Sequence, residues 1–324
     1  MRLPSYFAAA IVPFMCSPVV ASARTQRVHL RPEFVEGATL RYRIQTTTSS
    51  NEHNVAPVVN PEGASEYKQS TSLVVRIDVL QVRRQAASKD SVKFRATFEQ
   101  ADSDSRTNAY APSIVALDDA FEKLKGKSFE FSIDGASRLA DVQNLTKIAP
   151  DRDVAARVLS WVHVLFAPVS LPVRGILVGQ KWSDQREMSD LPLTNIFWRD
   201  NSEYLRNESC ASSSGVKNVP GLAPGSECAV LLTRFTIARR GSSHSDTTPE
   251  AYVRNGLRTS GNWTGSGESL DAISLTAGLL VSSTQTATQN MDYQIRSAAS
   301  GSTIRHVGHT TTQTEITLIP NPDQ

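Results

Sequence analysis

The stretch SVKFRATF, residues 91–98, alternates apolar and polar side chains without a break. Its apolar residues occupy every second position from Val92 to Phe98, and basic or hydroxyl side chains separate them. Successive side chains of an extended chain point to opposite faces, so this period of two is typical of a strand with one face in a core and the other in water. The stretch therefore favours an antiparallel sheet, which can be solvated on one side.

The same alternation recurs along most of the chain, in segments 40–45, 73–79, 129–133, 231–237, 273–286, 291–295 and 310–319. Segments 73–79 and 92–98 flank a short polar stretch, which predicts a hairpin. Two other segments, 112–125 and 151–167, space their apolar residues as a helix does. We therefore expect an α+β, mainly β fold, in which a large curved antiparallel sheet, half-barrel-like, has two helices packed on it.

The first 23 residues predict export. A short positive start precedes an apolar run, and small residues then lead to Ala23, after which we expect a signal peptidase to cut. The run is too short, and too interrupted by proline, to be a transmembrane segment. Residues 24–324 are expected to form a single β-rich domain with mobile loops at 46–70 and 210–228. A bacterial source and a periplasmic or extracellular location are expected.

Charge and cysteine content narrow the class of protein. The chain has 34 basic and 32 acidic residues and a formal net charge of +2, which does not favour a nucleic-acid partner. After signal removal, Cys210 and Cys228 remain, and an even pair in an exported protein predicts a disulfide. The alternative is two unpaired thiols.

No motif predicts catalysis or a cofactor. The Ser-x-x-Lys matches at Ser65 and Ser214 lack their companion motifs, and no nucleophile elbow has the required spacing. His306 and His309 are three residues apart, so on a strand they point to opposite faces and do not share a metal. We therefore assign no catalytic residue, no metal ligand and no cofactor, and keep a hydrolase with an unrecognised site as an alternative.

Three segments carry a resemblance: Phe129–Val142, residues 172–182 with the run Val178-Gly-Gln-Lys-Trp182, and Leu270–Ile295. Together they resemble exported bacterial proteins of unknown function, similar in outline to the envelope lipoprotein carriers. The resemblance implies a curved sheet that binds acyl chains beneath lid helices. It implies no catalytic residues.

Two kinds of function follow. The chain is expected to be a non-enzymatic binding or scaffold protein of the cell envelope, with a lipid or an envelope protein as its partner. As a carrier, it would hold an apolar ligand in the concavity of the sheet, where the candidate ligand-binding residues are Phe94, Phe98, Phe129, Phe131, Trp161 and His163. A filled interior and a core histidine explain the same residues without a ligand.

Overall fold

The computed structural model describes residues 27–55, 65–83, 91–108, 112–134, 138–166, 170–189, 191–210, 222, 225–241 and 247–321. The expected signal segment, residues 1–23, lies outside this part of the chain. So do residues 211–221, which make up most of the segment between the two cysteines.

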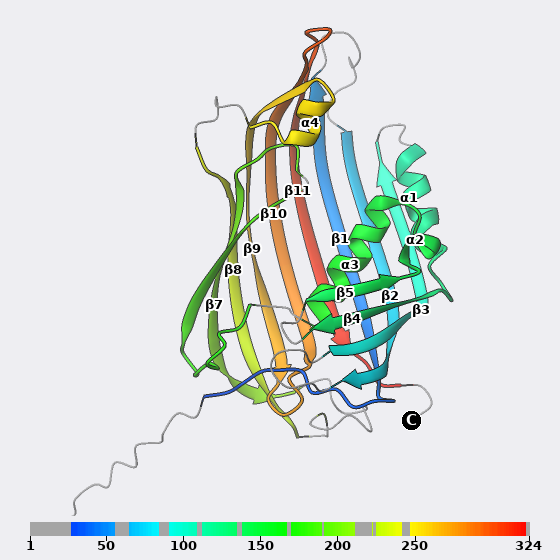
Figure 1. Ribbon diagram of the computed structural model, residues 1–324, viewed down its shortest axis with the longest axis vertical. Helices are drawn as coiled ribbons and strands as arrows, with labels where there is room; N and C mark the ends of the chain where they lie inside the picture. Colours follow the sequence, from blue (N-terminus) through cyan, green and yellow to red (C-terminus); the bar gives the residue numbers. More distant parts are fainter. Residues whose placement is uncertain are drawn as a thin grey trace, which may run out of the picture.

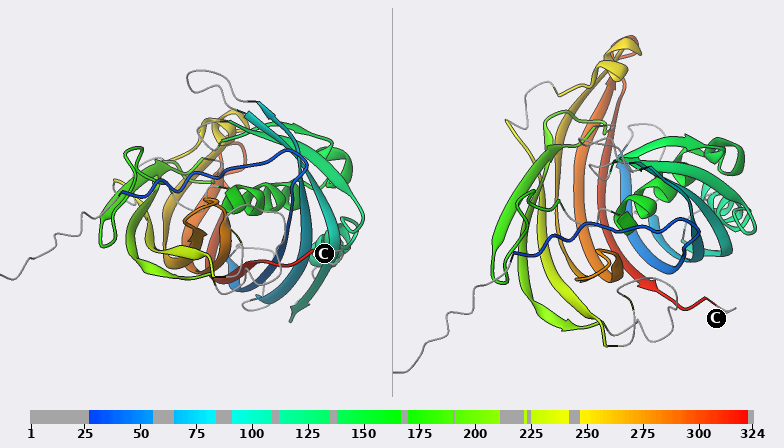
Figure 2. Two further views of the ribbon diagram at one scale, coloured as in Figure 1. Left: turned by 90° about the horizontal axis from the view of Figure 1, so that it is seen from below. Right: turned by 60° about the horizontal axis from the view of Figure 1, so that its bottom comes forward.

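The described residues form one large open sheet that curves around a central helix (Figures 1 and 2). Its eleven strands are all antiparallel and follow the order β5-β4-β3-β2-β1-β11-β10-β9-β8-β7-β6. The strands are β1 Thr39–Val55, β2 Ser65–Arg83, β3 Ser91–Thr107, β4 Ser128–Asp134, β5 Leu139–Gln143, β6 Lys181–Glu187, β7 Ile196–Ser209, β8 Glu227–Arg239, β9 Leu257–Ser274, β10 Leu280–Ser297 and β11 Thr303–Leu318. The expected fold class is confirmed.

Both expected helices are present. They are α1 (Pro112–Glu122) and α3 (Arg152–Phe166), and two short helices accompany them, α2 (Leu145–Ile148) and α4 (Glu250–Arg254). Helix α3 buries six apolar side chains against the sheet: Val154, Val158, Trp161, Val162, Leu165 and Phe166. Asp151 caps its start, because one carboxylate oxygen accepts the backbone N–H groups of residues 153 and 154.

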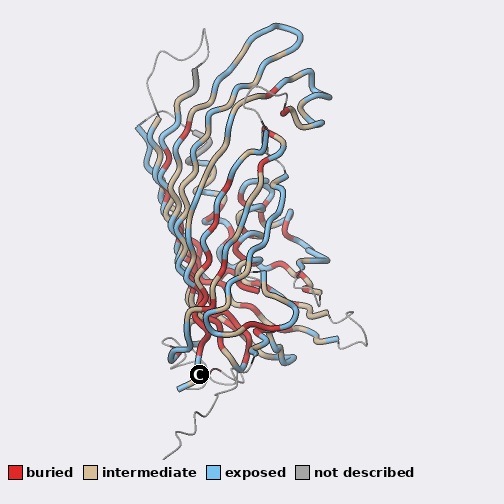
Figure 3. The backbone as a smooth tube through the Cα atoms, turned by 90° about the vertical axis from the view of Figure 1, so that its left-hand side faces the viewer, coloured by how far each residue is buried: buried red, intermediate tan, exposed pale blue. Residues whose placement is uncertain are grey.

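The main core occupies only the lower half of the molecule, where α3 lies inside the curve of the sheet (Figure 3). The N-terminal segment helps to close this end: Val28 pairs with Ile176, and Phe34 contacts the rings of Phe94 and Phe166. Above α3 the long strands continue, with few buried residues. The lower half of each long strand therefore has one face buried in the core, whereas its upper half is partly exposed.

The sequence prediction of a mobile loop over residues 46–70 is wrong for most of its length. Strand β1 continues to Val55 and β2 begins at Ser65, so residues 46–55 and 65–70 are paired strand residues. Hydroxyl side chains explain the error: β-branched threonine suits a strand, and hydroxyls opposite one another on adjacent strands bond together. Thr46 bonds Thr314, and Ser50 bonds Thr310 at 2.8 Å.

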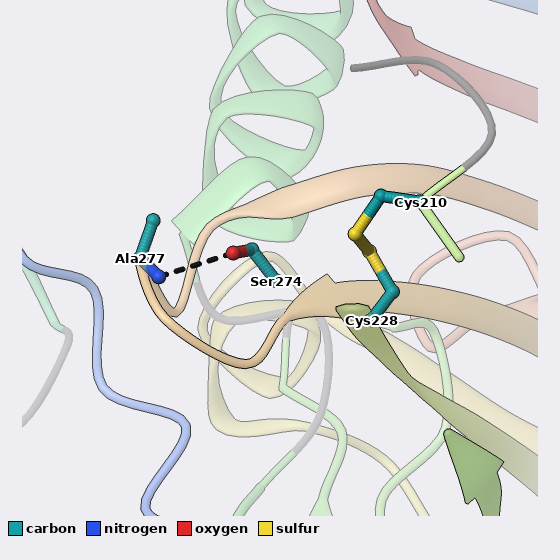
Figure 4. Close-up of a disulfide and its surroundings, with 4 residues drawn as sticks. All are labelled: Cys210, Cys228, Ser274 and Ala277. Carbon is teal, nitrogen blue, oxygen red and sulfur yellow. Dashed lines mark hydrogen bonds between the residues drawn. A yellow bond between two sulfur atoms is a disulfide. The ribbon is translucent and has the colours of Figure 1, made fainter. Parts of the chain in front are cut away.

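The predicted disulfide is present: Cys210, at the end of β7, is bonded to Cys228 at the start of β8 (Figure 4). The expected mobile loop over 210–228 is wrong at the residues that the structure describes there. Leu222 is fully buried in the core, and Glu227 and Cys228 belong to β8. Beside the bridge, the turn that leads into β10 is fixed because Ser274 Oγ accepts the backbone N–H of Ala277 at 3.0 Å.

Candidate ligand-binding face

The four phenylalanines proposed from the sequence lie together on the helix side of β3 and β4. Phe94, Phe98, Phe129 and Phe131 are each at most 1% exposed. Phe94 lies 5.2 Å from Phe131 and 4.8 Å from Phe166 of α3, measured between ring centroids. In this structure, then, the faces of these rings are covered by one another and by the helix.

The other two proposed residues lie on different faces of α3. Trp161 is buried and contacts Phe121 of α1 at 5.7 Å between centroids. His163 is exposed, although it belongs to α3, the helix that lies inside the curve of the sheet (Figure 2). The surrounding chain partly desolvates the ring and lowers its pKa, and the positive charge of Arg186 on β6 adds to this effect. His163 therefore does not join the aromatic group.

A belt of polar side chains crosses the helix side of the sheet directly above the core. The strand registers place one such residue on each of eight neighbouring strands, namely Ser103, Thr71, Thr46, Thr314, Gln285, Ser269, Thr233 and Ser202. Many bond to a neighbour in the belt, as Ser202 does to Thr233 at 2.9 Å. The belt therefore marks the upper border of the apolar core.

Asp271 of β9 lies at the lower border of this belt and is 1% exposed. Its carboxylate accepts the hydroxyl of Ser283 at 2.6 Å and that of Ser269 at 3.0 Å. Burial raises the pKa of Asp271 to about 6, because two hydroxyl donors offset only part of the lost hydration of the charge.

From Gln285 of the belt upward, the helix side of the sheet stays half-exposed. We call this surface the upper concave face. It consists of Thr48, Thr310, Thr312, Gln285, Ala287, Gln289, Met291, Tyr293, Trp263, Gly265, Gly267, Trp198 and Asp200. It therefore combines hydroxyls, amides, small residues and aromatic rings on four neighbouring strands, β1, β11, β10 and β9, and on β7.

Two groups of stacked rings flank the small residues of this face. On one side, Trp198 stacks on Phe235 with centroids 4.1 Å apart and planes 17° apart. On the other, Tyr293 lies 6.1 Å from Trp263 and 4.9 Å from His306, with planes within 21° of parallel. Both groups pack around a small second apolar cluster that includes Ile237.

Small residues lie between the two groups of rings. Gly265, Gly267 and Ala287 occupy neighbouring positions on β9 and β10. A Cβ added at Gly267 would lie 2.4 Å from the ring of Phe235, so the ring leans over this glycine. Glycine at this position lets an aromatic ring lie flat against the backbone.

The charges of this face are paired. Arg186 lies 3.6 Å from Asp200, between the guanidinium and carboxylate atoms, and its guanidinium lies 5.1 Å from the ring of Trp198. The indole N–H of Trp198 donates to Asp200 at 2.5 Å. Burial nevertheless raises the pKa of Asp200, and the two partners offset part of that effect.

A second polar cluster fixes the two main helices to the sheet. Asp118 of α1 accepts hydrogen bonds from Ser103, Ser105 and Gln69 at 2.5, 2.8 and 3.1 Å. Arg157 of α3 donates to the Gln69 amide oxygen at 2.6 Å. These bonds join both helices to β2 and β3, which suits a structural role.

Outside the upper concave face, the described residues offer few features that could bind a ligand or a metal. Two hollows with volumes of about 160 and 360 Å³ are lined mostly by residues of the convex face, and Arg305 and Asp292 pair with each other in the larger one. Within the described ranges, no three acidic, histidine or cysteine side chains converge as metal ligands would. None of the described helices is long and apolar enough to cross a membrane.

No protein-family model and no curated protein matches the chain, so sequence comparison gives no support to the expected resemblance to envelope carriers. Among solved structures, it is similar to lipovitellin, in a study of lipid–protein interactions, with 12% identity and a TM-score of 0.40 over 90% of this chain. The chain spans 26% of that protein.

Two further structures are more distant. DynF, from the dynemicin biosynthesis pathway of Micromonospora chersina, is 7% identical with a TM-score of 0.20, covering 98% of this chain and 96% of its own. The transport unit of the autotransporter AIDA-I from Escherichia coli is 7% identical with a TM-score of 0.25, covering 86% and 90%. Likenesses at this level carry no argument about function.

None of the residues proposed from the sequence belongs to the rings of the upper concave face. A signal for them exists, because Trp263, Gly265 and Gly267 alternate with polar residues and so share one face of a strand. Both faces of this strand are polar in composition, however, so the alternation does not say which face lies inside the curve.

Proposed function

We propose that this protein is a non-enzymatic binding protein of the cell envelope that holds its ligand on the upper concave face. The observation that carries the proposal is the contrast between the two halves of the sheet. In the lower half the rings are covered by α3, whereas Trp263, Tyr293 and Trp198 in the upper half stay partly exposed inside the curve. Partly exposed aromatic rings with nearby polar groups are typical of binding surfaces.

The envelope location in this proposal rests on the predicted export signal. The Cys210–Cys228 disulfide supports it, since such bonds persist in oxidising compartments.

The four tryptophans allow a site-resolved test, because they lie in different places. Trp263 and Trp198 lie on the upper concave face, Trp161 lies between α3 and α1, and Trp182 lies on the edge strand β6. Their indole N–H signals would be followed by NMR while lipid, polysaccharide and protein fractions of the cell envelope are added. We expect one fraction to shift Trp263 and Trp198 while Trp161 stays unchanged. If no fraction shifts the first two signals, the proposal fails.

The apolar carrier is the second candidate. It is favoured by the continuous apolar contact between α3 and the four phenylalanines, which would be open to an acyl chain if the helix moved away. Phe94, Phe98, Phe129, Phe131 and Trp161 would then line the ligand, and His163 would lie at its margin. In the same NMR experiment this function requires that the lipid fraction shift Trp161.

A further inference from the structure

We infer that the ligand of the upper concave face is an uncharged, hydroxyl-rich chain of the glycan class. This inference rests on the proposed function and names the ligand for the same site.

The first observation concerns free hydrogen-bonding groups. Within the part of the chain that the structure describes, no hydrogen bond to the side-chain amide of Gln285 is found. The Gln289 amide oxygen accepts the indole N–H of Trp263 at 3.1 Å, and its amide nitrogen has no protein partner among the described residues. Both side chains are half-buried on the concave side, so their free amide groups are available to a ligand. An amide both donates and accepts, as a sugar hydroxyl does.

The second observation is the spacing of these groups. Gln285, Thr314 and Thr46 lie side by side on β10, β11 and β1, and the next row holds Ala287, Thr312 and Thr48. Adjacent strands lie about 4.8 Å apart, so the first row places a polar group at each strand step. The hydroxyls of Thr46 and Thr314 in this row also bond each other. A chain of sugar units lying across the strands would meet such a group at every step.

The third observation is the position of the rings. Trp263 and Trp198 are half-exposed and lie on either side of Gly265, Gly267 and Ala287, where Phe235 packs over Gly267 and Ile237 packs over Gly265. The C–H groups of a sugar ring pack on aromatic carbon while its hydroxyls bond amides and hydroxyls. Rings next to amides therefore match both parts of a sugar unit.

Other ligand classes fit less well. An acyl chain would cover the hydroxyls and amides without bonding them, which is unfavourable. A polyanion would need free cations, but Arg186 is paired with Asp200 and the guanidinium of Arg239 donates to a backbone carbonyl at 2.5 Å. A peptide adding to the sheet would need free backbone groups, and those of β9, β10 and β11 are used in their ladders.

The test uses the whole protein and three uncharged hexasaccharides: cellohexaose, maltohexaose and chitohexaose. We expect at least one of them to shift the indole signals of Trp263 and Trp198 in a saturable manner. The substitution Gln285→Ala should weaken this binding about tenfold, the effect of one lost hydrogen bond to a ligand. The matched control is Gln313→Ala, because Gln313 is an exposed glutamine on the convex face of the neighbouring strand. It should leave the affinity unchanged.

The possible outcomes distinguish a failure of the glycan inference from a failure of the proposed binding face. If none of the three hexasaccharides shifts the indole signals, or if both glutamine variants lose affinity equally, the glycan inference is overturned. If an envelope protein fraction shifts Trp263 while the hexasaccharides do not, the binding face stands and only the ligand class fails. If nothing shifts Trp263, both fail. Equal thermal midpoints of the two variants would show that a lost affinity is not a folding defect.

Discussion

Replacing the buried Asp271 by asparagine should make the protein more stable at neutral pH. The carboxylate is 1% exposed, and its two hydrogen-bond donors, Ser283 and Ser269, are uncharged. Its pKa is about 6 in the folded protein and 3.8 without the fold. Because the folded pKa is the higher one, the folded state binds the proton more tightly. This contribution to stability is complete below about pH 4 and is lost as the pH rises through about 6.

The size of the effect follows from the shift. Two pKa units correspond to about 3 kcal/mol, a sizeable part of the 5–15 kcal/mol that stabilises a typical domain. Asparagine has the same shape and no charge, so Asp271→Asn should raise the free energy of unfolding by up to about 3 kcal/mol at pH 7.5. At pH 4 the variant and the parent should be nearly equal, since the parent is then protonated.

Urea unfolding at pH 4 and pH 7.5, extrapolated to zero denaturant, measures this difference. Comparing variant with parent at each pH cancels the titration of the other groups. Asp102→Asn is the control, because it removes an exposed carboxylate on β3 and should leave the free energy of unfolding at pH 7.5 close to that of the parent. The reasoning is refuted if Asp271→Asn is no more stable than the parent at pH 7.5, or if its advantage is the same at both pH values.

Three further changes test the packing. Replacing Cys210 and Cys228 by alanine opens a link across 18 residues and should lower the free energy of unfolding by about 3 kcal/mol; unchanged urea midpoints would contradict this. Gly267→Ala places a Cβ against Phe235 and should cost about 1–3 kcal/mol, seen as a lower thermal midpoint. Asp118→Ala removes the acceptor of three hydrogen bonds, so amide hydrogen exchange in α1 should speed up, and unaltered protection would argue against the anchoring role.

The local pattern of the chain predicted most of the elements. The alternation around Phe94 and Phe98 gave the β2–β3 hairpin, and helical spacing placed the two main helices within a few residues of their ends. It failed where both faces of a strand are polar. Residues 46–55 contain no apolar alternation, and it is their pairing with β2 and with β11, some 260 residues away, that makes them a strand. Hydroxyls that bond across two strands leave no periodic signal in either strand alone.

The candidate site, like the fold, could be predicted from the sequence only in part. The sequence alone determined that Phe94 and Phe98 share one face of a strand and that Phe129 and Phe131 share one face of another, because neighbouring residues of a strand point to opposite sides. It also indicated the disulfide through its even cysteine pair. Only the tertiary structure decided that α3 covers those rings, and that Trp198, Trp263 and Tyr293 remain partly exposed inside the curve. The reason is that curvature and register arise from pairing across the whole sheet. They determine which polar rows are covered and which face solvent, and no single segment encodes them.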